Sequence, residues 1–257
     1  MTLRAVVTGA STGIGEATAR ALRAAGWEVI AVARRADRLD RLAAEIGVTP
    51  IATDLTDDAS VDALVAKLEH IGPIDLLVNI AGGARGSESV EASSIDDWRW
   101  MFEANVIATK RLTSGVLPLL RKAAVAHGVG TIVMLTSTAG MVAYQGGGGY
   151  NAAKFAEHAM TQALRLELAG EPIRIIEVAP GLVQTEEFAL NRLGDAEAAA
   201  NVYNGVDEPL VAADVADVIV DAVRKPKHVN LDLIVMRPVA QAAQHLLIRE
   251  PLQVKND

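Results

Sequence analysis

Two residues of the stretch GGGGYNAAKF, which runs from Gly146 to Phe155, could carry proton-transfer chemistry. In a helix, the four-residue spacing places the phenol of Tyr150 and the ammonium of Lys154 on one face. A phenol with the ordinary pKa of about 10 is a poor proton donor or acceptor at neutral pH. A cation about 4 Å away favours the ionised phenol by up to ~4 kcal/mol at an effective dielectric constant of ~20, while burial opposes it. The pair therefore predicts an acid–base tyrosine with a lowered pKa, beside glycines that leave room for a substrate. The plainer interpretation is a Tyr–Lys pair on a helix surface.

A serine precedes this pair at the end of an apolar run. Ser137, in the stretch LTSTAG, could donate a hydrogen bond to a substrate carbonyl, although a single serine in such a place is most often an ordinary loop residue. The five histidines are scattered without the spacing of metal ligands, so no metal site is predicted. The chain has no cysteine, which excludes disulfides and thiolate chemistry and fits a reducing cytoplasm.

Glycines near the start of the chain indicate a nucleotide site. The stretch TGASTGIG, from Thr8 to Gly15, joins an apolar run to a helical pattern, and its glycines follow the spacing G-x3-G-x-G. Such glycines let the backbone approach a pyrophosphate, and a helix N-terminus supplies free N–H groups and the positive end of the helix dipole. Glycines also make ordinary turns, but the strand–loop–helix context favours a nucleotide.

The end of the second apolar run, in AVARRADR, indicates which nucleotide. In folds of this kind a carboxylate at this place binds the ribose 2′-hydroxyl of NAD(H). Here the place falls on Ala33, followed by Arg34 and Arg35, which can hold a 2′-phosphate through charge-assisted hydrogen bonds. The alternative is a solvated helix start with two surface arginines. The sequence favours NADP(H), with Arg34 as the main contact, and leaves NAD(H) open.

Apolar runs that alternate with helical patterns must position these residues. Strands rich in Val, Ile and Leu, each followed by a helix, predict a parallel sheet buried on both faces, in a doubly wound α/β fold of the Rossmann type. Long helices are expected at Asp96–Ala126, with a break near Pro118, and at Tyr150–Ala169. About seven strands are expected, at Leu3–Thr8, Glu28–Ala33, Pro50–Thr53, Ile74–Asn79, Thr131–Thr136, Ile173–Ala179 and Leu233–Met236.

Composition limits the remaining organisation. No low-complexity linker divides the 257 residues, so a single domain spanning 1–257 is expected. The polar, alanine-rich segment near 184–206 follows the sixth strand and is expected to form a lid over the substrate. The formal net charge of −8 argues against nucleic acid or an anionic membrane as a partner. No apolar run approaches ~20 residues and the first residues do not resemble a signal peptide, so a cytoplasmic protein without a membrane helix is expected.

Together, these motifs resemble the short-chain dehydrogenase/reductase family, over about Leu3 to Pro238. The stretch NIAG, Asn79–Gly82, is similar to the family's Asn-Asn-Ala-Gly motif, with Ile80 in place of the second asparagine. The stretch EANV supplies Asn105, the asparagine of a catalytic tetrad, and PGLVQT, Pro180–Thr185, resembles the motif beside the nicotinamide. The tail from HVNLDLIVMRP onward resembles NADP-dependent 3-hydroxy acid dehydrogenases and clavulanate-type aldehyde reductases.

The resemblance implies a mechanism and a cofactor site. NADPH would deliver a hydride to a carbonyl carbon, Ser137 would steady the carbonyl oxygen, and Tyr150 would protonate it. Lys154 would lower the pKa of the tyrosine and bind the nicotinamide ribose, and Asn105 would hold a water that links Lys154 to solvent. These four residues form the expected tetrad. The expected cofactor contacts are Gly9, Ser11, Thr12, Gly13, Ile14, Gly15, Arg34, Arg35, Asp54, Leu55, Asn79, Ala81, Gly82, Tyr150, Lys154, Pro180, Gly181, Val183 and Thr185.

The expected function is that of an NADP(H)-dependent oxidoreductase that interconverts a carbonyl and a primary or secondary alcohol on a small molecule. A sugar-nucleotide epimerase or dehydratase shares the Tyr-x3-Lys pair, and a non-catalytic NADP(H)-sensing protein shares the fold, so both stay open as alternatives. The sequence does not specify the substrate. Its pocket should involve residues 83–87, 139–145 and 184–206, with Arg85 as an anion anchor or, more simply, a solvated loop residue.

Two apolar helical stretches bear on assembly. Trp98–Leu120 and Tyr150–Leu168 look too hydrophobic for burial on one side alone. Members of the family pair these helices about a two-fold axis, and the resemblance therefore implies a homotetramer. The alternative is that both helices are buried inside the monomer.

Overall fold

Seven parallel strands form one sheet. In the computed structural model, which describes residues 2–254, they lie in the order β3-β2-β1-β4-β5-β6-β9, and every neighbouring pair is parallel. The strand order reverses between β1 and β4, the place where such sheets bind ligands. The prediction of a doubly wound α/β fold is confirmed. The strands are β1 (Arg4–Thr8), β2 (Glu28–Ala33), β3 (Thr49–Ala52), β4 (Leu76–Asn79), β5 (Gly130–Leu135), β6 (Ile173–Pro180) and β9 (Leu233–Met236).

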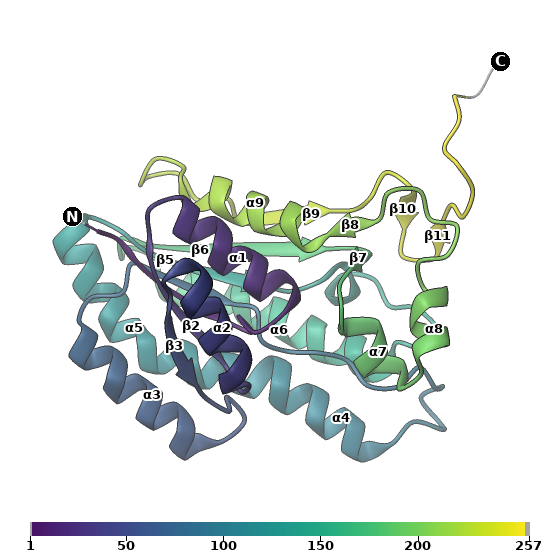
Figure 1. The fold of residues 1–257 in the computed structure, drawn as a ribbon, viewed down its shortest axis with the longest axis horizontal. Helices are drawn as coiled ribbons and strands as arrows, with labels where there is room; N and C mark the ends of the chain where they lie inside the picture. The colour runs from purple at the N-terminus through teal and green to yellow at the C-terminus, as the bar shows by residue number, and fades with distance from the viewer. Residues whose placement is uncertain (1, 255–257) are drawn as a thin grey trace.

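Helices cover both faces of the sheet (Figure 1). Buried side chains of α1, α2 and α9 pack on one face, and buried side chains of α3 and α5, with partly buried ones of α6, pack on the other. Gly47 and Gly128 cap α2 and α5 with φ values of 71° and 88°, a conformation that favours glycine. The helices are α1 (Gly13–Ala24), α2 (Ala36–Ile46), α3 (Asp58–Ile71), α5 (Ala108–His127), α6 (Gly148–Glu167) and α9 (Ala212–Val223).

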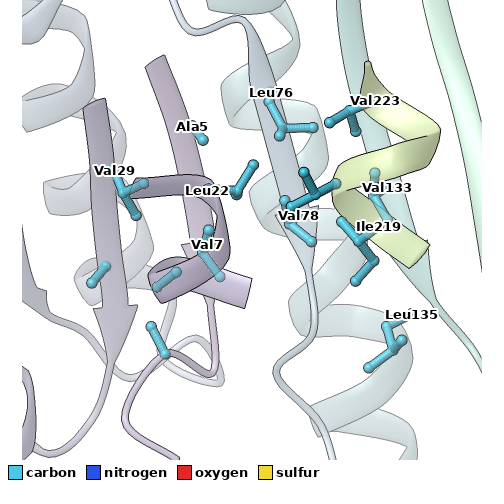
Figure 2. Packing of buried hydrophobic residues seen from close by; sticks show 14 of the residues in the cluster. Ala5, Val7, Leu22, Val29, Leu76, Val78, Val133, Leu135, Ile219 and Val223 are labelled. Atoms are coloured by element: carbon cyan, nitrogen blue, oxygen red, sulfur yellow. The ribbon is translucent and has the colours of Figure 1, made fainter. Parts of the chain in front are cut away.

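The core explains why the strands are almost uniformly apolar. Figure 2 shows Val7, Val78 and Val133 on neighbouring strands, on the face that Leu22 of α1 and Ile219 of α9 cover. All five side chains are fully buried. Burying each such side chain contributes roughly 1.5–3 kcal/mol. Because helices cover both faces, nearly every residue of the five inner strands is buried and these strands carry no exposed face, whereas the edge strands β3 and β9 are partly exposed.

The long helical region before β5 is irregular, but not where the sequence predicts it. Helix α4 (Ile95–Phe102) is followed by a π turn at Glu103–Ile107 and then by α5, which runs unbroken through Pro118. In the π turn, the amide of Ala108 donates to the carbonyl of Glu103, five residues earlier. The prediction of a break near Pro118 is therefore wrong. Wide turns of this kind occur frequently at functional sites.

The chain after β6 forms small elements beside the sheet. Strand β7 (Val183–Gln184) pairs with β8 (Leu210–Val211), and the residues between them include α7 (Phe188–Leu193) and α8 (Ala196–Asn201). The predicted lid thus contains two short helices. Beyond β9, the chain forms a hairpin of β10 (Gln241–Ala243) and β11 (Leu246–Leu247) next to this segment (Figure 1). Over the described residues, no helix is long and apolar enough to cross a membrane.

Candidate active site

A cavity of about 770 Å³ lies at the carboxyl ends of the central strands. The glycine-rich loop after β1 lines one part of it, and Ser137, Tyr150 and Lys154 line another. Residues of α7 and of the β10–β11 hairpin close over it. The cavity therefore joins the predicted nucleotide site to the predicted proton-transfer residues in one continuous space.

Three of the four expected tetrad residues meet at this cavity. Tyr150 and Lys154 lie one turn apart on α6, and Lys154 Nζ is 5.9 Å from the centroid of the Tyr150 ring. Ser137, two residues after the end of β5, donates to the carbonyl of Pro180 at 3.3 Å and accepts from the amide of Ala139 at 3.1 Å. It is close enough to act on the pKa of Tyr150. All three are more than nine-tenths buried, so a reacting group among them would be shielded from water.

The pKa of Tyr150 is raised above its usual value, whereas the sequence predicts a lowered one. Burial is the largest cause, because it penalises the charged phenolate, and the Lys154 ammonium opposes it without overcoming it. Two features explain why the ammonium does not overcome burial: its distance from the phenol ring, and a carboxylate that it also contacts. Glu157 Oε2 accepts from Lys154 Nζ at 2.6 Å, so the cation that should favour the phenolate is paired with an anion.

Asn105, the fourth expected tetrad residue, lies in the π turn and does not reach the cavity. Its side chain is fully buried, donates to the carbonyls of Gly83 and Met101 at 2.9 and 2.7 Å, and accepts from the Gly83 amide at 3.1 Å. These bonds tie the loop after β4 to the π turn. The amide group thus holds backbone in place, and its expected role in holding a water stays a prediction.

The glycines before Tyr150 have a different role from the one expected. None of residues 146–149 lines the cavity, and α6 begins at Gly148, inside the glycine run. A Cβ atom on Gly148 would lie 3.1 Å from the Trp98 ring, and one on Gly149 would collide with Met101. The glycines let α4 approach the first turn of α6, which fixes the position of Tyr150. Gly148 and Gly149 face α4 and none of the four glycines lines the cavity, so the expectation that they border the substrate stays a prediction that the cavity does not support.

The glycine-rich loop has the shape that a dinucleotide phosphate requires. Gly9 and Gly13 have φ values of 66° and 53°, and a side chain on Gly15 would collide with the backbone of Gly9. Thr12, at the N-cap of α1, makes no side-chain bond to the first turn of the helix. The N–H groups of that turn and the backbone of the loop therefore face the cavity and fit a bound NADP(H) or NAD(H).

The arginines after β2 lie at the adenosine end of the cavity. Arg34 lines the cavity, and its side chain makes no hydrogen bond or ion pair with any of residues 2–254. Hydrogen bonds from Thr56 and, to a lesser degree, the Arg34 charge hold the pKa of Asp54 below its usual range. Arg34 thus faces the predicted adenine side with its donors available, and the position at the end of β2, Ala33, carries no acid.

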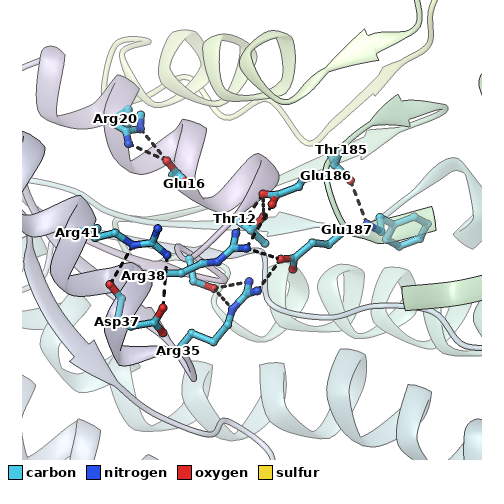
Figure 3. A network of polar contacts seen from close by, with 12 residues as sticks. Thr12, Glu16, Arg20, Arg35, Asp37, Arg38, Arg41, Thr185, Glu186 and Glu187 are labelled. Carbon is cyan, nitrogen blue, oxygen red and sulfur yellow. Dashed lines mark hydrogen bonds and ion pairs between the residues drawn. The ribbon is translucent and has the colours of Figure 1, made fainter. Parts of the chain in front are cut away.

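Arg35 is engaged differently. It donates to Ser11 Oγ at 3.0 Å and to Glu187 Oε1 at 2.6 Å, and Arg38 contacts Glu187 and Glu186 at 3.2 and 3.1 Å (Figure 3). The two glutamates directly precede α7. A polar network therefore joins the start of the predicted lid to the arginines of α2 and to the glycine-rich loop.

The other expected cofactor residues divide into two groups. Those that line the cavity are Ser11, Thr12, Ile14, Asp54, Leu55, Ala81, Gly82, Pro180, Gly181, Val183 and Thr185. Asn79 does not. Its amide donates to Thr113 Oγ1 at 3.1 Å and to Met134 Sδ at 3.3 Å, and the residue is 3% exposed. Asn79 therefore braces the end of β4 from inside the protein, which argues against a direct side-chain contact with the cofactor.

The sequence interpretation missed a cation close to Tyr150. Arg192, on α7, has its guanidinium carbon 5.9 Å from the Tyr150 ring centroid and 5.6 Å from that of Tyr144. It donates to the Tyr144 hydroxyl and to the carbonyls of Gly86 and Gly146. Among residues 2–254 it has no carboxylate partner, and its hydrogen bonds go to neutral oxygens. No signal in the sequence singled it out, because α7 is too short to show periodicity.

Arg85, the cation that the sequence did name, lies over the ring of Trp100 at 4.1 Å and 3.6 Å from Asp97. Arg85 lines the cavity, but its guanidinium already interacts with the Trp100 ring and the Asp97 carboxylate. Other lining residues that the sequence did not indicate come from the β10–β11 hairpin and from the chain just beyond it: Gln241, Gln244, Leu247 and Arg249.

Comparison with known proteins identifies the family. The family model for short chain dehydrogenase matches residues 4–194. The chain belongs to this family. It is 51% identical to an uncharacterized oxidoreductase of Mycobacterium tuberculosis (strain ATCC 25618 / H37Rv), over 97% of this chain and 96% of that protein. It is 37% identical to the serine 3-dehydrogenase of Agrobacterium fabrum (strain C58 / ATCC 33970), over 92% and 94% of the two chains.

The fold agrees with that of a solved relative. The closed form of a serine dehydrogenase complexed with NADP+ superposes with a TM-score of 0.88, at 32% identity, covering 99% of this chain and 100% of that one. The chain is thus an oxidoreductase of the short-chain dehydrogenase family, the class that acts on CH–OH groups.

One departure from the family's motif has a structural explanation. Ile80 stands where the family usually has a second asparagine. The hydroxyl of Thr8, at the end of β1, accepts from the amides of Ile80 and Ala81 at 2.8 and 3.0 Å and donates to the carbonyl of Val78 at 3.2 Å. The loop after β4 is therefore held by its backbone, and the side chain at position 80 contributes no bond that the loop requires.

Proposed function

We propose that this short-chain dehydrogenase is an NADP(H)-dependent oxidoreductase that interconverts a carbonyl and an alcohol, with Tyr150 as the acid–base residue. The observation that carries the proposal is the shared cavity, into which both the glycine-rich loop and the buried Ser137, Tyr150 and Lys154 open. Such a space brings a dinucleotide and a small substrate together beside one ionisable hydroxyl.

Different residues of the cavity would bind different parts of the cofactor. The backbone of Gly9–Gly15 and the first turn of α1 would hold the pyrophosphate, and Arg34 would hold a 2′-phosphate. Lys154 and the Pro180–Thr185 loop also line the cavity, and there they would border the nicotinamide ribose. When bound, the nicotinamide supplies the hydride for reduction and accepts it for oxidation.

Proton transfer falls to the chain's own residues. In reduction, the hydroxyl of Tyr150 gives its proton to the oxygen that becomes the alcohol, while Ser137 hydrogen-bonds the same oxygen. In oxidation, the tyrosinate takes the proton back. The raised pKa of Tyr150 keeps the phenol protonated at neutral pH, and this state suits the proton donor that carbonyl reduction requires.

Arg192 supports a substrate that carries an anion. Its guanidinium lies over Tyr150 and lacks a carboxylate partner among the described residues, and each of its bonds goes to a neutral oxygen. A substrate carboxylate or sulfonate two bonds from the reacting carbon would give this guanidinium the anionic partner that it lacks. Serine, the substrate in the names of two relatives, is such a compound, and we propose a small 2- or 3-carbon hydroxy acid or its oxo form as the substrate class.

The test is a panel of alcohol substrates with and without a carboxylate. NADPH formation would be measured with L-serine and 3-hydroxypropanoate and compared with that for 1,3-propanediol, in which a neutral group replaces the carboxylate. We expect Arg192→Leu to raise KM for the acids roughly 10- to 100-fold, because charge-assisted bonds are lost, with little effect on the diol. Arg192→Lys should fall between. Absence of NADP(H)-dependent turnover on any alcohol or carbonyl would sink the proposed activity and favour a non-catalytic NADP(H) sensor.

A further inference from the structure

A buried acid that the expected tetrad does not include stands beside Lys154. Glu157 lies on α6, three residues after Lys154, and is 2% exposed. An acid at this depth is unusual, because removing a carboxylate from water is costly unless it is paired. The pairing partner here is the lysine of the active site.

The contact between the two residues is short and enclosed. Lys154 Nζ donates to Glu157 Oε2 at 2.6 Å and to the carbonyl of Leu135 at 3.1 Å. The side chains of Lys154 and Glu157 are 7% and 2% exposed. Water does not screen a pair at this depth, so each charge acts strongly on its neighbours. Tyr150, four residues before Lys154, is the nearest group whose protonation state the reaction uses.

We propose that Glu157 is a positioning residue that anchors Lys154 and offsets its charge, so that Tyr150 remains a protonated phenol at neutral pH. The inference rests on the proposed function, because the protonation state of Tyr150 matters only where this residue transfers a proton. It assigns to this enzyme a buried counter-ion for its lysine, and a bias toward carbonyl reduction at neutral pH.

Other charged groups face this pair from the elements around it. Glu177 of β6 is 1% exposed, accepts from Thr136 Oγ1 at 2.6 Å and contacts His158 Nδ1 at 2.7 Å. Its charge adds to that of Glu157 at Lys154. Beside Tyr150 lie the Tyr144 hydroxyl, from the loop before α6, and the Arg192 guanidinium, from α7. Glu157 is the member of this set that bonds directly to Lys154.

The pKa shifts of Lys154 and Tyr150 agree in sign with the proposal, while burial raises the pKa of Glu157 itself and the Lys154 ammonium opposes that shift. Burial alone would lower the pKa of Lys154, but the Glu157 carboxylate and further negative groups raise it, so the lysine stays an ammonium. At Tyr150, burial raises the pKa, the Lys154 ammonium lowers it, and the Glu157 charge works against the ammonium. Removing the charge at 157 leaves the ammonium uncompensated, which stabilises tyrosinate and lowers the pKa of Tyr150.

The decisive experiment is the pH profile of Glu157→Gln, which keeps the size of the side chain and removes its charge. The profile would be measured for oxidation of the best alcohol of the panel with NADP+. Oxidation needs the tyrosinate, so the acidic limb of kcat/KM should move to lower pH, raising the rate at neutral pH relative to the alkaline plateau by roughly three- to tenfold. Glu167→Gln, an exposed acid near the end of the same helix, should leave the profile unchanged.

A second readout separates this inference from the proposed function. The chain has three tyrosines, so ultraviolet difference titration of each protein against its Tyr150→Phe counterpart follows the ionisation of Tyr150 without a substrate. Tyr150 should ionise at lower pH in Glu157→Gln than in the parent. If that variant does not fold, Glu157→Asp, which draws the charge back from Lys154, should move both measurements in the same direction by less.

The inference is overturned if either variant leaves the limb and the ionisation of Tyr150 in place or moves them to higher pH. Such a result, with Tyr150→Phe inactive, would leave the proposed function intact. Conversely, the parent protein could show no turnover while Tyr150 ionises at lower pH in Glu157→Gln. That result would support Glu157 as the counter-ion of Lys154 and contradict the proposed function.

Discussion

At the scale of single residues, three buried groups of α6 act on one another: Tyr150, Lys154 and Glu157. The lysine lies between the phenol and the acid, bonded to the acid at 2.6 Å and 5.9 Å from the centre of the phenol ring. The tendency of Tyr150 to ionise therefore depends on how much of the lysine's charge the acid leaves available. The same reasoning applies at the other end of the cavity, where Arg34 has no acid partner among the described residues and Arg35 has one.

The first prediction concerns Arg34 and the choice of cofactor. Its donors face a cavity wall on which Ala33 supplies no acid, so a 2′-phosphate should favour NADP(H) over NAD(H) by roughly 10- to 100-fold. Arg34→Ala should lose most of this discrimination, and Ala33→Asp with Arg34→Asn should turn it toward NAD(H), because a carboxylate repels the phosphate and accepts from a free hydroxyl. The measurement is kcat/KM with both cofactors at fixed ionic strength.

Arg41→Ala is the matched control, since Arg41 lies on α2 and pairs with Asp37 at an exposed position. It should leave the preference unchanged. A parent enzyme that prefers NADH, or an Arg34→Ala variant with unaltered discrimination, would show that the phosphate is bound elsewhere.

Residue spacing allowed the Tyr150–Lys154 pair, Ser137 and the glycine-rich loop to be predicted, because helix periodicity and strand ends fix where such residues meet. The net pKa of Tyr150 could not be predicted in this way. It depends first on the burial of the phenol, then on the Lys154 ammonium and, to a smaller degree, on the Glu157 charge, and tertiary packing sets all three. The role of the glycines before Tyr150 could not be predicted for a similar reason, because the sequence does not show which neighbouring residues a side chain at those positions would contact.

At the scale of elements, the segment between β7 and β8 connects the two ends of the cavity. Its first residues, Glu186 and Glu187, bond to Arg38 and Arg35, and its helix α7 brings Arg192 over Tyr150. A cofactor phosphate near Arg35 would compete with the Glu187 carboxylate for the same donors. A rearrangement at the start of the segment would then be passed to α7 and so to the substrate end.

The second prediction is therefore that residues 184–206 act as a lid that reorganises when NADPH binds. Lids close to exclude water and to complete the site. This segment contacts the cofactor side through Glu186 and Glu187, and the substrate side through Arg192 of α7. Hydrogen exchange of residues 184–206, with and without saturating NADPH, should show greater protection in the complex. Strand β5, in the core, serves as the internal control and should not change.

Equal protection of the segment in both states would contradict the lid. The existence of a segment over the cavity could be predicted from its place after the sixth strand. Its two helices, each of six residues, could not, because such short elements contain too few turns to show a hydrophobic period. For the same reason Arg192 could not be identified as a candidate residue. The π turn at Asn105 was equally hidden, since it arises from a hydrogen-bond shift and not from a breaker residue.

At the scale of the whole molecule, the alternation of strands and helices was sufficient to predict the parallel sheet. Strands with no polar face must be buried on both sides, and connections between parallel strands of one sheet are right-handed. The strand order placed the loops of β1, β4, β5 and β6 at one edge of the sheet, where the cavity lies. The topology thus accounts for the convergence of residues that are far apart in the chain.

The third prediction is a homotetramer. Phe102 of α4, Ile107 of the π turn and Phe155 of α6 are 43%, 37% and 41% exposed, on the helices that the sequence marked as too apolar for one-sided burial. Pairing α4–α5 and α6 with a second copy would cover them. Sedimentation at micromolar concentration should give about four times the chain mass of 27.0 kDa. A species with the mass of one chain would refute the assembly.

The central claim, that Tyr150 is the acid–base residue, is tested most directly by the turnover number of Tyr150→Phe. The substitution removes one hydroxyl at the cavity and keeps the ring that packs edge-on against Phe188 at 5.7 Å, so the fold and the affinity for NADPH, measured by fluorescence titration, should persist. Turnover should fall by roughly 10²- to 10⁴-fold, because no other described hydroxyl is placed to protonate the product oxygen with the help of Lys154. A variant that binds NADPH and turns over at close to the parent rate would contradict the account.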